Sequence, residues 1–193
     1  MNRAEIINKL IQTFKYENYL EIGIGRGFNY NQINCVNKTS VDPNPKTNAS
    51  CPMESDQFFK INKTEYDIIF IDGLHHQDQC FRDILNSLKC LKENGTIVVH
   101  DCNPRSCESQ LVPRIQEIWN GDVWKAWVKL RSIAKALDMF VVDTDEGCGI
   151  IRRGNQRLIT DIYLKYGSFV ENKINWLNLK PIEYFEKWLI SKT

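Results

Sequence analysis

Apolar residues recur along the chain with two different periods, one typical of helices and one typical of buried strands. Residues 2–15 place apolar side chains three and four positions apart, which predicts an amphipathic helix. Residues 66–71 form an almost continuous apolar run, which is typical of a central parallel strand buried on both faces. Residues 76–91 show the clearest helical spacing, with apolar side chains at Phe81, Ile84, Leu85, Leu88 and Leu91.

The rest of the chain continues this alternation of strands and helices. Further strands are predicted at about 19–24, 39–42, 96–99, 139–143 and 149–151, with a weakly signalled short strand within 46–52. Further helices are predicted at about 27–34, 53–60 and 123–137, together with a helix of about eight residues between Pro113 and Gly121. Asp122 is the expected cap of the helix at 123–137.

Strands and helices that alternate and end in a hairpin predict an α/β fold. We expect a single Rossmann-like, doubly wound sheet, mostly parallel, with an antiparallel last strand after a turn around Glu146 and Gly147. No repeat, low-complexity segment or linker interrupts the chain. Residues 1–193 are therefore expected to form one domain, with a core at 1–152 and a helical tail at 153–193. The aromatic residues of the tail favour packing or a dimer surface, so a homo-oligomer is one expected arrangement.

Composition and charge narrow the range of partners. The 193 residues include 25 basic and 24 acidic ones, and the net charge of +1 leaves no electrostatic footprint for nucleic acid or an anionic membrane. No apolar run approaches the roughly 20 residues of a membrane span, and the first residues show no leader pattern, so a cytoplasmic location is expected. The seven cysteines are scattered without a C-x-x-C pair, which disfavours a zinc site or a disulfide framework.

A glycine-rich turn follows the strand predicted at 19–24. Its sequence is E-x-G-x-G-x-G, formed by Glu21, Gly23, Gly25 and Gly27. A dinucleotide-binding turn has the spacing G-x-G-x-x-G, and Phe28 occupies the place of its third glycine. Asp42 ends the next predicted strand seventeen residues after Gly25, where a carboxylate binds ribose hydroxyls in nucleoside-binding folds. The pattern resembles motif I of the class I S-adenosylmethionine (SAM)-dependent methyltransferases, and a simple tight turn is the alternative.

Two further segments stand where predicted central strands end, Asp72-Gly-Leu-His75 and His100-Asp101. Ligands bind at this edge of open α/β sheets, and neighbouring strands lie roughly 4.8 Å apart, so Asp72 and Asp101 would meet if the two strands are adjacent. Oxygen ligands so close together suit Mg²⁺ or Mn²⁺ better than zinc. His75 would then project beside the metal, where an imidazole can accept the proton of an alcohol that is being methylated.

The D-x-x-H and H-D segments resemble the metal-dependent sugar O-methyltransferases of the macrocin and mycinamicin group. The resemblance implies that Asp72 and Asp101 bind the metal and that His75 is the catalytic base. Asp72 thereby also joins the expected catalytic and cofactor-binding residues. His100 departs from that group, which has an acid at this position. A pair of His100 and Asp101 would still bind Mn²⁺ or Fe²⁺; alternatively, the alternation of the strand turns His100 away.

The resemblance to class I enzymes places the adenine ring of SAM after the second strand, against Met53, Ser55 and Asp56. It implies a bond from Ser55 or Asp56 to the adenine amine and packing of Met53 on the ring. The alternative is that one of the two polar residues caps a helix. Structural alternatives also exist for Asp72, as a cap of the following helix, and for His75, as a backbone partner in its own turn.

The acceptor side is expected between Asn103 and Trp127. Three tryptophans in this part can stack on sugar faces, and packing in the core is their alternative role: Trp119, Trp124 and Trp127. A phosphate of the acceptor can pair with Arg105 or Lys125. The hairpin turn is flanked by Asp143 and Asp145, which can reach the acceptor or serve only the turn. His76 is expected to be structural or to face the substrate.

These patterns predict SAM-dependent O-methylation, assisted by Mg²⁺ or Mn²⁺, of a hydroxyl group on a small-molecule sugar. A nucleotide sugar or a glycan precursor is the expected acceptor, and His75 the general base. The alternatives are a non-catalytic SAM-binding scaffold and an O-methyltransferase of another hydroxylated small molecule, such as a catechol. The glycine spacing disfavours a nucleotide-dependent oxidoreductase, and Asn103-Pro104 lacks the rest of a nucleic-acid adenine methyltransferase motif.

Overall fold

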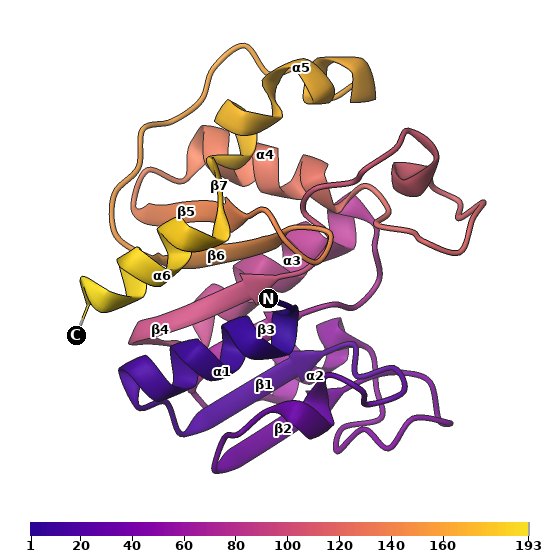
Figure 1. Ribbon diagram of the computed structural model, residues 1–193. Helices are drawn as coiled ribbons and strands as arrows, with labels where there is room; N and C mark the ends of the chain where they lie inside the picture. The colour runs from indigo at the N-terminus through magenta and orange to yellow at the C-terminus, as the bar shows by residue number, and fades with distance from the viewer. Residues whose placement is uncertain (193) are drawn as a thin grey trace.

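A seven-stranded sheet lies between two layers of helices in the computed structural model, which describes residues 1–192 (Figure 1). Its strand order is β2-β1-β3-β4-β6-β5-β7. The strands are β1 (Asn18–Ile22), β2 (Asn37–Val41), β3 (Tyr66–Ile71), β4 (Leu91–Val99), β5 (Leu137–Val142), β6 (Cys148–Arg153) and β7 (Leu179–Lys180). Neighbouring strands pair in parallel except at β6, which runs antiparallel to both β4 and β5. The doubly wound, mostly parallel α/β sheet predicted from the sequence is therefore confirmed.

Helices cover both faces of this sheet, as Figure 1 shows. One face carries α1 (Arg3–Phe14) and α6 (Ile182–Ile190). The other carries α2 (Ser55–Ile61), α3 (Gln77–Lys89), α4 (Val123–Ile133) and α5 (Tyr166–Leu177). Two 3₁₀ turns, η1 (Tyr30–Gln32) and η2 (Glu108–Gln110), lie in loops. Within residues 1–192, no helix combines the length and the apolar character that crossing a bilayer requires.

Each face of the sheet has its own core because side chains alternate along the strands. In β3, Ile69 and Ile71 pack toward α2 to α5, whereas Ile68 and Phe70 pack toward α1 and α6. All four side chains are at most 3% exposed. The unbroken apolar run of β3 thus corresponds to burial on both faces, as predicted.

The C-terminal tail is only partly the helical segment predicted from the sequence. Residues 155–165 are irregular. The short strand β7, which follows α5 and precedes α6 along the chain, pairs with β5 at the edge of the sheet. Trp176, Phe185 and Trp188 are buried against the two cores. Packing is therefore the role of these aromatic residues.

The helix predicted at 27–34 is wrong, because its residues form only the single turn η1. Asparagine side chains explain the difference. Asn29 turns inward and donates from Nδ2 to Glu21 Oε2 at 3.0 Å, and the backbone N–H of Asn34 donates to Asn8 Oδ1 at 2.8 Å. Such side-chain bonds compete with the hydrogen-bond ladder of a helix. The chain therefore passes from the glycine turn to β2 with hardly any helix between them.

The short helix predicted from Pro113 is also wrong, because residues 111–121 form a loop. The Nε1–H of Trp119 donates to the carbonyl oxygen of Leu111 at 2.6 Å and closes this loop on itself. Ile115 and Ile118 are 60% and 64% exposed. A short helix gains most of its stability from packing an apolar face, and this segment packs none.

Two other boundaries differ from the prediction. The strand expected within 46–52 is reduced to a single bridge between Val41 and Cys51. The helix expected to reach Leu91 ends at Lys89, and Leu91 instead begins β4. The helical spacing of Leu91 is therefore coincidental, since an apolar residue suits the first position of a buried strand equally well.

Asp122 has a different role from the predicted one. It precedes α4, but no side-chain bond caps that helix, which ends at Ile133. Its Oδ1 instead accepts the backbone N–H of Gln77, the first residue of α3, at 2.7 Å. A carboxylate is favourable at a helix N-terminus, so Asp122 stabilises the start of α3 and ties it to α4.

The carboxyl ends of β1, β3 and β4 meet at one edge of the sheet. In the register of these strands, Ile71 pairs with both Ile22 and Val99. The residues that follow β3 and β4, Asp72 and His100, are therefore neighbours. The N-terminus of α1 lies at the same edge, beside these two residues.

Candidate active site

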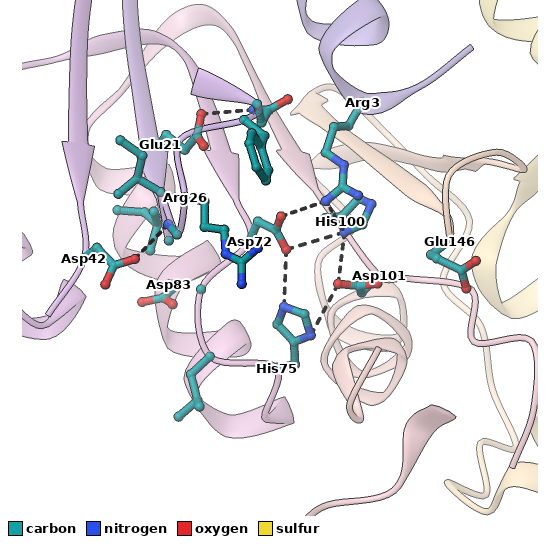
Figure 2. A pocket seen from close by; sticks show the side chains of 18 of the residues that line it. Arg3, Glu21, Arg26, Asp42, Asp72, His75, Asp83, His100, Asp101 and Glu146 are labelled. Carbon is teal, nitrogen blue, oxygen red and sulfur yellow. Dashed lines mark hydrogen bonds and ion pairs between the residues drawn. The ribbon is translucent and has the colours of Figure 1, made fainter. Parts of the chain in front are cut away.

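A cavity of about 920 Å³ opens at this edge of the sheet. The glycine turn after β1 and Asp42 after β2 line one end, which we call the donor end. The segments after β3 and β4, the loop at 114–119 and the turn at 145–146 line the other, which we call the catalytic end. Figure 2 shows Asp42 and Glu21 on one side of this cavity, with the acids and histidines of the other end facing them. A cavity of this size holds a drug-sized ligand.

The donor end is shaped by backbone. Gly23, Gly25 and Gly27 have φ values of 88°, 50° and 75°, a region that favours glycine. A Cβ on Gly23 would lie 2.1 Å from the carbonyl oxygen of Asp72, so this turn and the end of β3 are too close for any side chain. Gly25 faces open space, and its N–H donates to Asp42 Oδ2 at 2.9 Å. The turn is therefore tightly packed at Gly23 and open to a ligand at Gly25.

The two predicted acids of the donor end have different surroundings. Asp42 is half-buried at the cavity, and its Oδ1 also accepts the backbone N–H of Asn44 at 2.9 Å. Glu21 is 1% exposed and accepts hydrogen bonds from the Tyr19 hydroxyl and from Asn29 Nδ2. Burial raises the pKa of Glu21 to about 7. Both acids line the cavity, but Asp42 is the more exposed, whereas Glu21 is held by Tyr19 and Asn29.

The three residues predicted at adenine are not gathered at one place. Ser55 lines the cavity, but its Oγ donates to Asp83 Oδ1 at 2.7 Å. Asp56 is not among the residues that line the cavity and pairs with Arg82 Nε at 3.3 Å. Met53 packs against the core beneath α2 to α5. No side-chain bond caps α2, so neither polar residue has the alternative capping role. Binding of adenine by these residues stays a prediction.

Asp83 is a cavity residue that the sequence analysis missed. It is 1% exposed and accepts hydrogen bonds from Ser55 Oγ and from Gln79 Nε2 at 3.0 Å. Burial raises the pKa of Asp83 to about 6. An acid between Cys80 and Ile84, on the buried face of α3, is the sequence signal that points to it.

At the catalytic end, the two predicted segments come together because β3 and β4 are adjacent and parallel. His100 Nδ1 lies 2.9 Å from Asp101 Oδ2 and 3.4 Å from Asp72 Oδ1. His75 bridges the same acids, with Nε2 3.3 Å from Asp72 Oδ1 and Nδ1 3.4 Å from Asp101 Oδ2. The dashed lines of Figure 2 trace these contacts. His100 therefore faces the site, and the alternative in which the strand turns it away is wrong.

Arg3 and Asp145 complete this cluster. Arg3 Nη1 lies 2.9 Å from Asp72 Oδ2 and 3.2 Å from His100 Nδ1. Asp145 accepts from Arg3 Nε at 3.0 Å, from Nη2 at 3.2 Å and from its backbone N–H at 2.7 Å. Asp145 thus lines the cavity, and its contact with an acceptor stays a prediction. Arg3 was not predicted, because it stands 69 positions from Asp72 in no recognisable motif.

The charges in the cluster stabilise one another. Burial opposes a charge on Asp72, but His100 and His75 hold the pKa of Asp72 well below its usual range. Burial alone would lower the pKa of both histidines, yet the surrounding carboxylates raise the pKa of His75, and still more that of His100, above the ordinary 6.5. Burial likewise opposes the charge of Arg3, and its carboxylate partners outweigh burial and raise the pKa.

The 114–119 loop orients His75. The carbonyl oxygen of Trp119 lies 3.0 Å from His75 Nδ1, and the two rings stack with their centres 5.0 Å apart. This contact assigns a proton to Nδ1 and leaves Nε2 beside Asp72. Trp119 lies 44 positions from His75 along the chain. The alternative in which His75 bonds only to the backbone of its own turn is therefore wrong. Asp72 does not cap α3. The N-cap residue of α3 is His76, and its side chain makes no capping hydrogen bond.

The aromatic and basic residues predicted on the acceptor side divide into two groups. Trp119 is half-buried and lines the cavity, with His76 edge-on to it. Trp124 and Trp127 are fully buried, so their core role is confirmed. The two predicted cations do not line the cavity and form ion pairs elsewhere, Arg105 with Asp143 at 2.9 Å and Lys125 with Asp122 at 3.2 Å.

Arg3 also bears on the predicted metal. The part of the chain that the structure describes has two groups of three residues whose ligand atoms lie within 4.8 Å of one another: Asp72, His75 and Asp101, and His100, Asp145 and Cys148. Arg3 contacts Asp72 in the first group and His100 in the second. A guanidinium and a divalent cation compete for the same carboxylate, and a cation is disfavoured beside a fixed positive charge. In this arrangement the predicted set of Asp72, His100 and Asp101 does not fit Mg²⁺ or Mn²⁺.

Comparisons with known proteins agree with the fold. Residues 20–102 match the model of a protein family described as a methyltransferase domain. The matched segment runs from β1 to the end of β4 and includes the glycine turn, Asp42, Asp72, His75 and Asp101. A search of curated proteins finds no match.

Solved methyltransferases share this fold. A putative caffeoyl-CoA O-methyltransferase from Staphylococcus aureus aligns with a TM-score of 0.59 and 20% identity, over 78% of this chain and 82% of that chain. The SAH-bound methyltransferase PaMTH1 from Podospora anserina aligns with a TM-score of 0.60 and 16% identity, over 79% and 78%. The O-methyltransferase TomG from Streptomyces achromogenes, in complex with SAM, gives 0.56 and 10%, over 79% and 80%.

The chain therefore has the fold of these methyltransferases, and its residues 20–102 are similar to a methyltransferase domain.

Proposed function

We propose that this chain transfers a methyl group from SAM to a hydroxyl group of a small sugar, such as a nucleotide sugar or a glycan precursor, with His75 as the general base. One observation carries the proposal: His75 stands at the catalytic end of the same cavity that Gly25 and Asp42 line at the donor end. A donor and an acceptor bound in this cavity would meet beside a base.

The donor end suits the nucleoside part of SAM. Open backbone at Gly25 allows close approach of the ligand, and the Asp42 carboxylate can accept hydrogen bonds from ribose hydroxyls. The hydrogen-bonded pair of Ser55 and Asp83 lies at the same end of the cavity and offers oxygen acceptors for the adenine amine. SAM supplies a methyl group on a positively charged sulfur, and its transfer to oxygen leaves S-adenosylhomocysteine (SAH).

His75 removes the proton that makes a hydroxyl a poor nucleophile. The Trp119 carbonyl oxygen holds the proton on Nδ1, so Nε2 is the atom that accepts. The imidazolium formed in this step lies 3.3 Å from Asp72 and 3.4 Å from Asp101, which stabilise its charge. A positioned base of this kind contributes about 10²–10⁴-fold to a rate.

The acceptor surroundings favour a polar ligand near the base. Hydrogen-bonding side chains line the cavity there, among them Asn2, Arg114, Glu117 and Glu146. Such a lining suits the several hydroxyl groups of a sugar. A second candidate, a hydroxylated molecule with an apolar body such as a catechol, is favoured by Phe28, Leu74 and Ile118, which line the same cavity and are 71%, 53% and 64% exposed.

The donor is tested by thermal unfolding of the full chain with SAH, with NADH and without ligand. A ligand that binds only the folded state raises the unfolding temperature, so SAH is expected to raise it and NADH is not. No shift at saturating SAH would contradict the proposed donor.

The acceptor is tested by transfer of a labelled methyl group from SAM to a panel of nucleotide sugars and catechols. Turnover of a nucleotide sugar is expected, and it should vanish in His75→Ala while SAH binding persists. Turnover of catechols alone would replace the sugar by the second candidate. A His75→Ala protein as active as the wild type would refute the base assignment.

A further inference from the structure

Arg3 contacts Oδ2 of Asp72, beside the point at which Asp72 Oδ1 and Asp101 Oδ2 would share a cation. Its guanidinium contacts Asp72 on one side and Asp145 on the other, and Nη1 also reaches His100 Nδ1. Five N–H groups in a planar fork suit this arrangement, since one guanidinium can bind two carboxylates at once.

The backbone holds Arg3 in place, so the contact does not depend on a freely moving side chain. Asn2 and Glu5 form a capping box that defines the first turn of α1. Asp145 accepts the backbone N–H of Arg3 as well as its side chain. The Arg3 side chain is 32% exposed and therefore partly shielded from water. Both ends of the residue are fixed by the same acid.

Every carboxylate of the cluster already has a nitrogen partner. Arg3 pairs with Asp72 and Asp145, and His75 and His100 both contact Asp72 and Asp101. A divalent cation would have to enter a few ångströms from a permanent positive charge. At that distance the two positive charges repel each other.

We propose that the guanidinium of Arg3 takes the place of a divalent cation in this site. Arg3 excludes Mg²⁺ and Mn²⁺ and positions Asp72 against His75, so the site works without a metal. The inference deepens the proposed function by stating how its catalytic end is held. It does not require that function to be correct, because ion binding is measured without a methyl donor or an acceptor.

The test is Mn²⁺ binding to the full chain, followed by electron paramagnetic resonance, which distinguishes free from bound ion. The wild type is expected to leave Mn²⁺ free. Arg3→Ala uncovers the carboxylates. The variant is expected to bind Mn²⁺ about a hundredfold more tightly, because the repulsion between the guanidinium and the ion is removed. Adding Asp72→Asn to Arg3→Ala should abolish that binding, which places the ion at this cluster.

Matched variants separate charge from disturbance of the fold. Arg26→Ala removes an arginine that lines the same cavity and should leave Mn²⁺ binding as weak as in the wild type. Arg3→Lys keeps a positive charge and should still exclude the ion. Arg3→Met keeps the length of the side chain without its charge, and it replaces Arg3→Ala if circular dichroism shows that the alanine variant is unfolded.

Three results would overturn the proposal. The first is a wild type that binds one Mn²⁺ as tightly as Arg3→Ala or Arg3→Met does. The second is a folded, uncharged variant that binds no more Mn²⁺ than the wild type. The third is an Arg3→Lys protein that binds as tightly as the uncharged variants. SAH binding is recorded on the same samples, so failure of the donor assignment is seen separately.

Discussion

The donor end and the catalytic end of the cavity are built in opposite ways. The donor end comes from neighbouring stretches of chain, and its shape rests on three glycines with positive φ and on backbone N–H groups held by Asp42. The catalytic end brings together side chains from α1, from the segments after β3 and β4, and from the hairpin turn. The donor end should therefore be sensitive to substitutions that change the backbone, and the catalytic end to substitutions that change charge.

The largest effect is expected from His75→Ala, which acts on the catalytic end alone. Loss of a general base should lower turnover by about 10²–10⁴-fold, while SAH binding at the donor end stays within error. His76→Ala is the matched control, since His76 packs edge-on to Trp119 without bonding Asp72. Methyl-transfer rates and SAH calorimetry measure both ends. Equal loss of binding and turnover in His75→Ala would break the comparison.

Gly23→Ala should affect both ends, because this residue is where they touch. Its Cβ would lie 2.1 Å from the Asp72 carbonyl oxygen at a φ of 88°. Strain and overpacking together should lower the free energy of unfolding by about 3 kcal/mol or more. Gly25→Ala has a φ of 50° but open space, and should cost about 1 kcal/mol. Urea unfolding of both variants measures the difference, and equal losses would show that the close approach is unimportant.

Asp42→Ala should weaken the donor end without touching the base. Removal of the carboxylate that we propose binds ribose hydroxyls should reduce SAH affinity by about tenfold to a hundredfold, since hydrogen bonds to charged groups contribute about 1.5–3 kcal/mol. Calorimetry measures the affinity. Asp56→Ala serves as control and sharpens the comparison, because unchanged affinity there would dismiss the adenine role predicted from the sequence, and reduced affinity would support it.

The pH dependence of turnover should follow the catalytic end. Asp72 and Asp101 face His75, and despite burial they raise its pKa above 6.5. The base must be neutral to accept a proton, so the rate should rise with pH and reach half its maximum above pH 6.5. Below that midpoint the rate should fall about tenfold per pH unit. Single-turnover rates from pH 5.5 to 9 test this, and a midpoint below 6.5 would contradict the arrangement of charges.

A change of stability with pH is expected from Glu21→Gln at the donor end. The pKa of Glu21 is raised to about 7 by burial, so the folded state binds a proton that the unfolded state releases near its usual pKa. The stability contributed by this proton is present at low pH and is lost as pH rises through about 7. Glutamine does not titrate, so the variant should not show this loss. Its free energy of unfolding, relative to that of the wild type, should rise by about 2 kcal/mol on going from pH 5 to pH 8. Urea unfolding at both values checks the sign.

The parts of the site that the sequence predicted depend on short stretches of chain. The apolar run of β3 indicates where the strand ends, so the position of Asp72 and His75 follows from it. The glycine turn and Asp42 follow from their spacing in the same way. The helix at 27–34 was predicted wrongly because helical propensity says nothing about where Asn29 and its neighbours find their hydrogen-bond partners.

By itself, the sequence determined the doubly wound sheet, the glycine turn and the edge at which Asp72, His75 and Asp101 stand. Periodicity and glycine spacing are local properties, and they survive in any fold that buries the strands. Only the tertiary structure decided that Arg3 and Asp145 enter the site, that Trp119 holds His75, and that Trp124 and Trp127 belong to the core. Arg3 and Asp145 are 142 positions apart, and an ion pair between such distant residues leaves no periodic pattern along the chain.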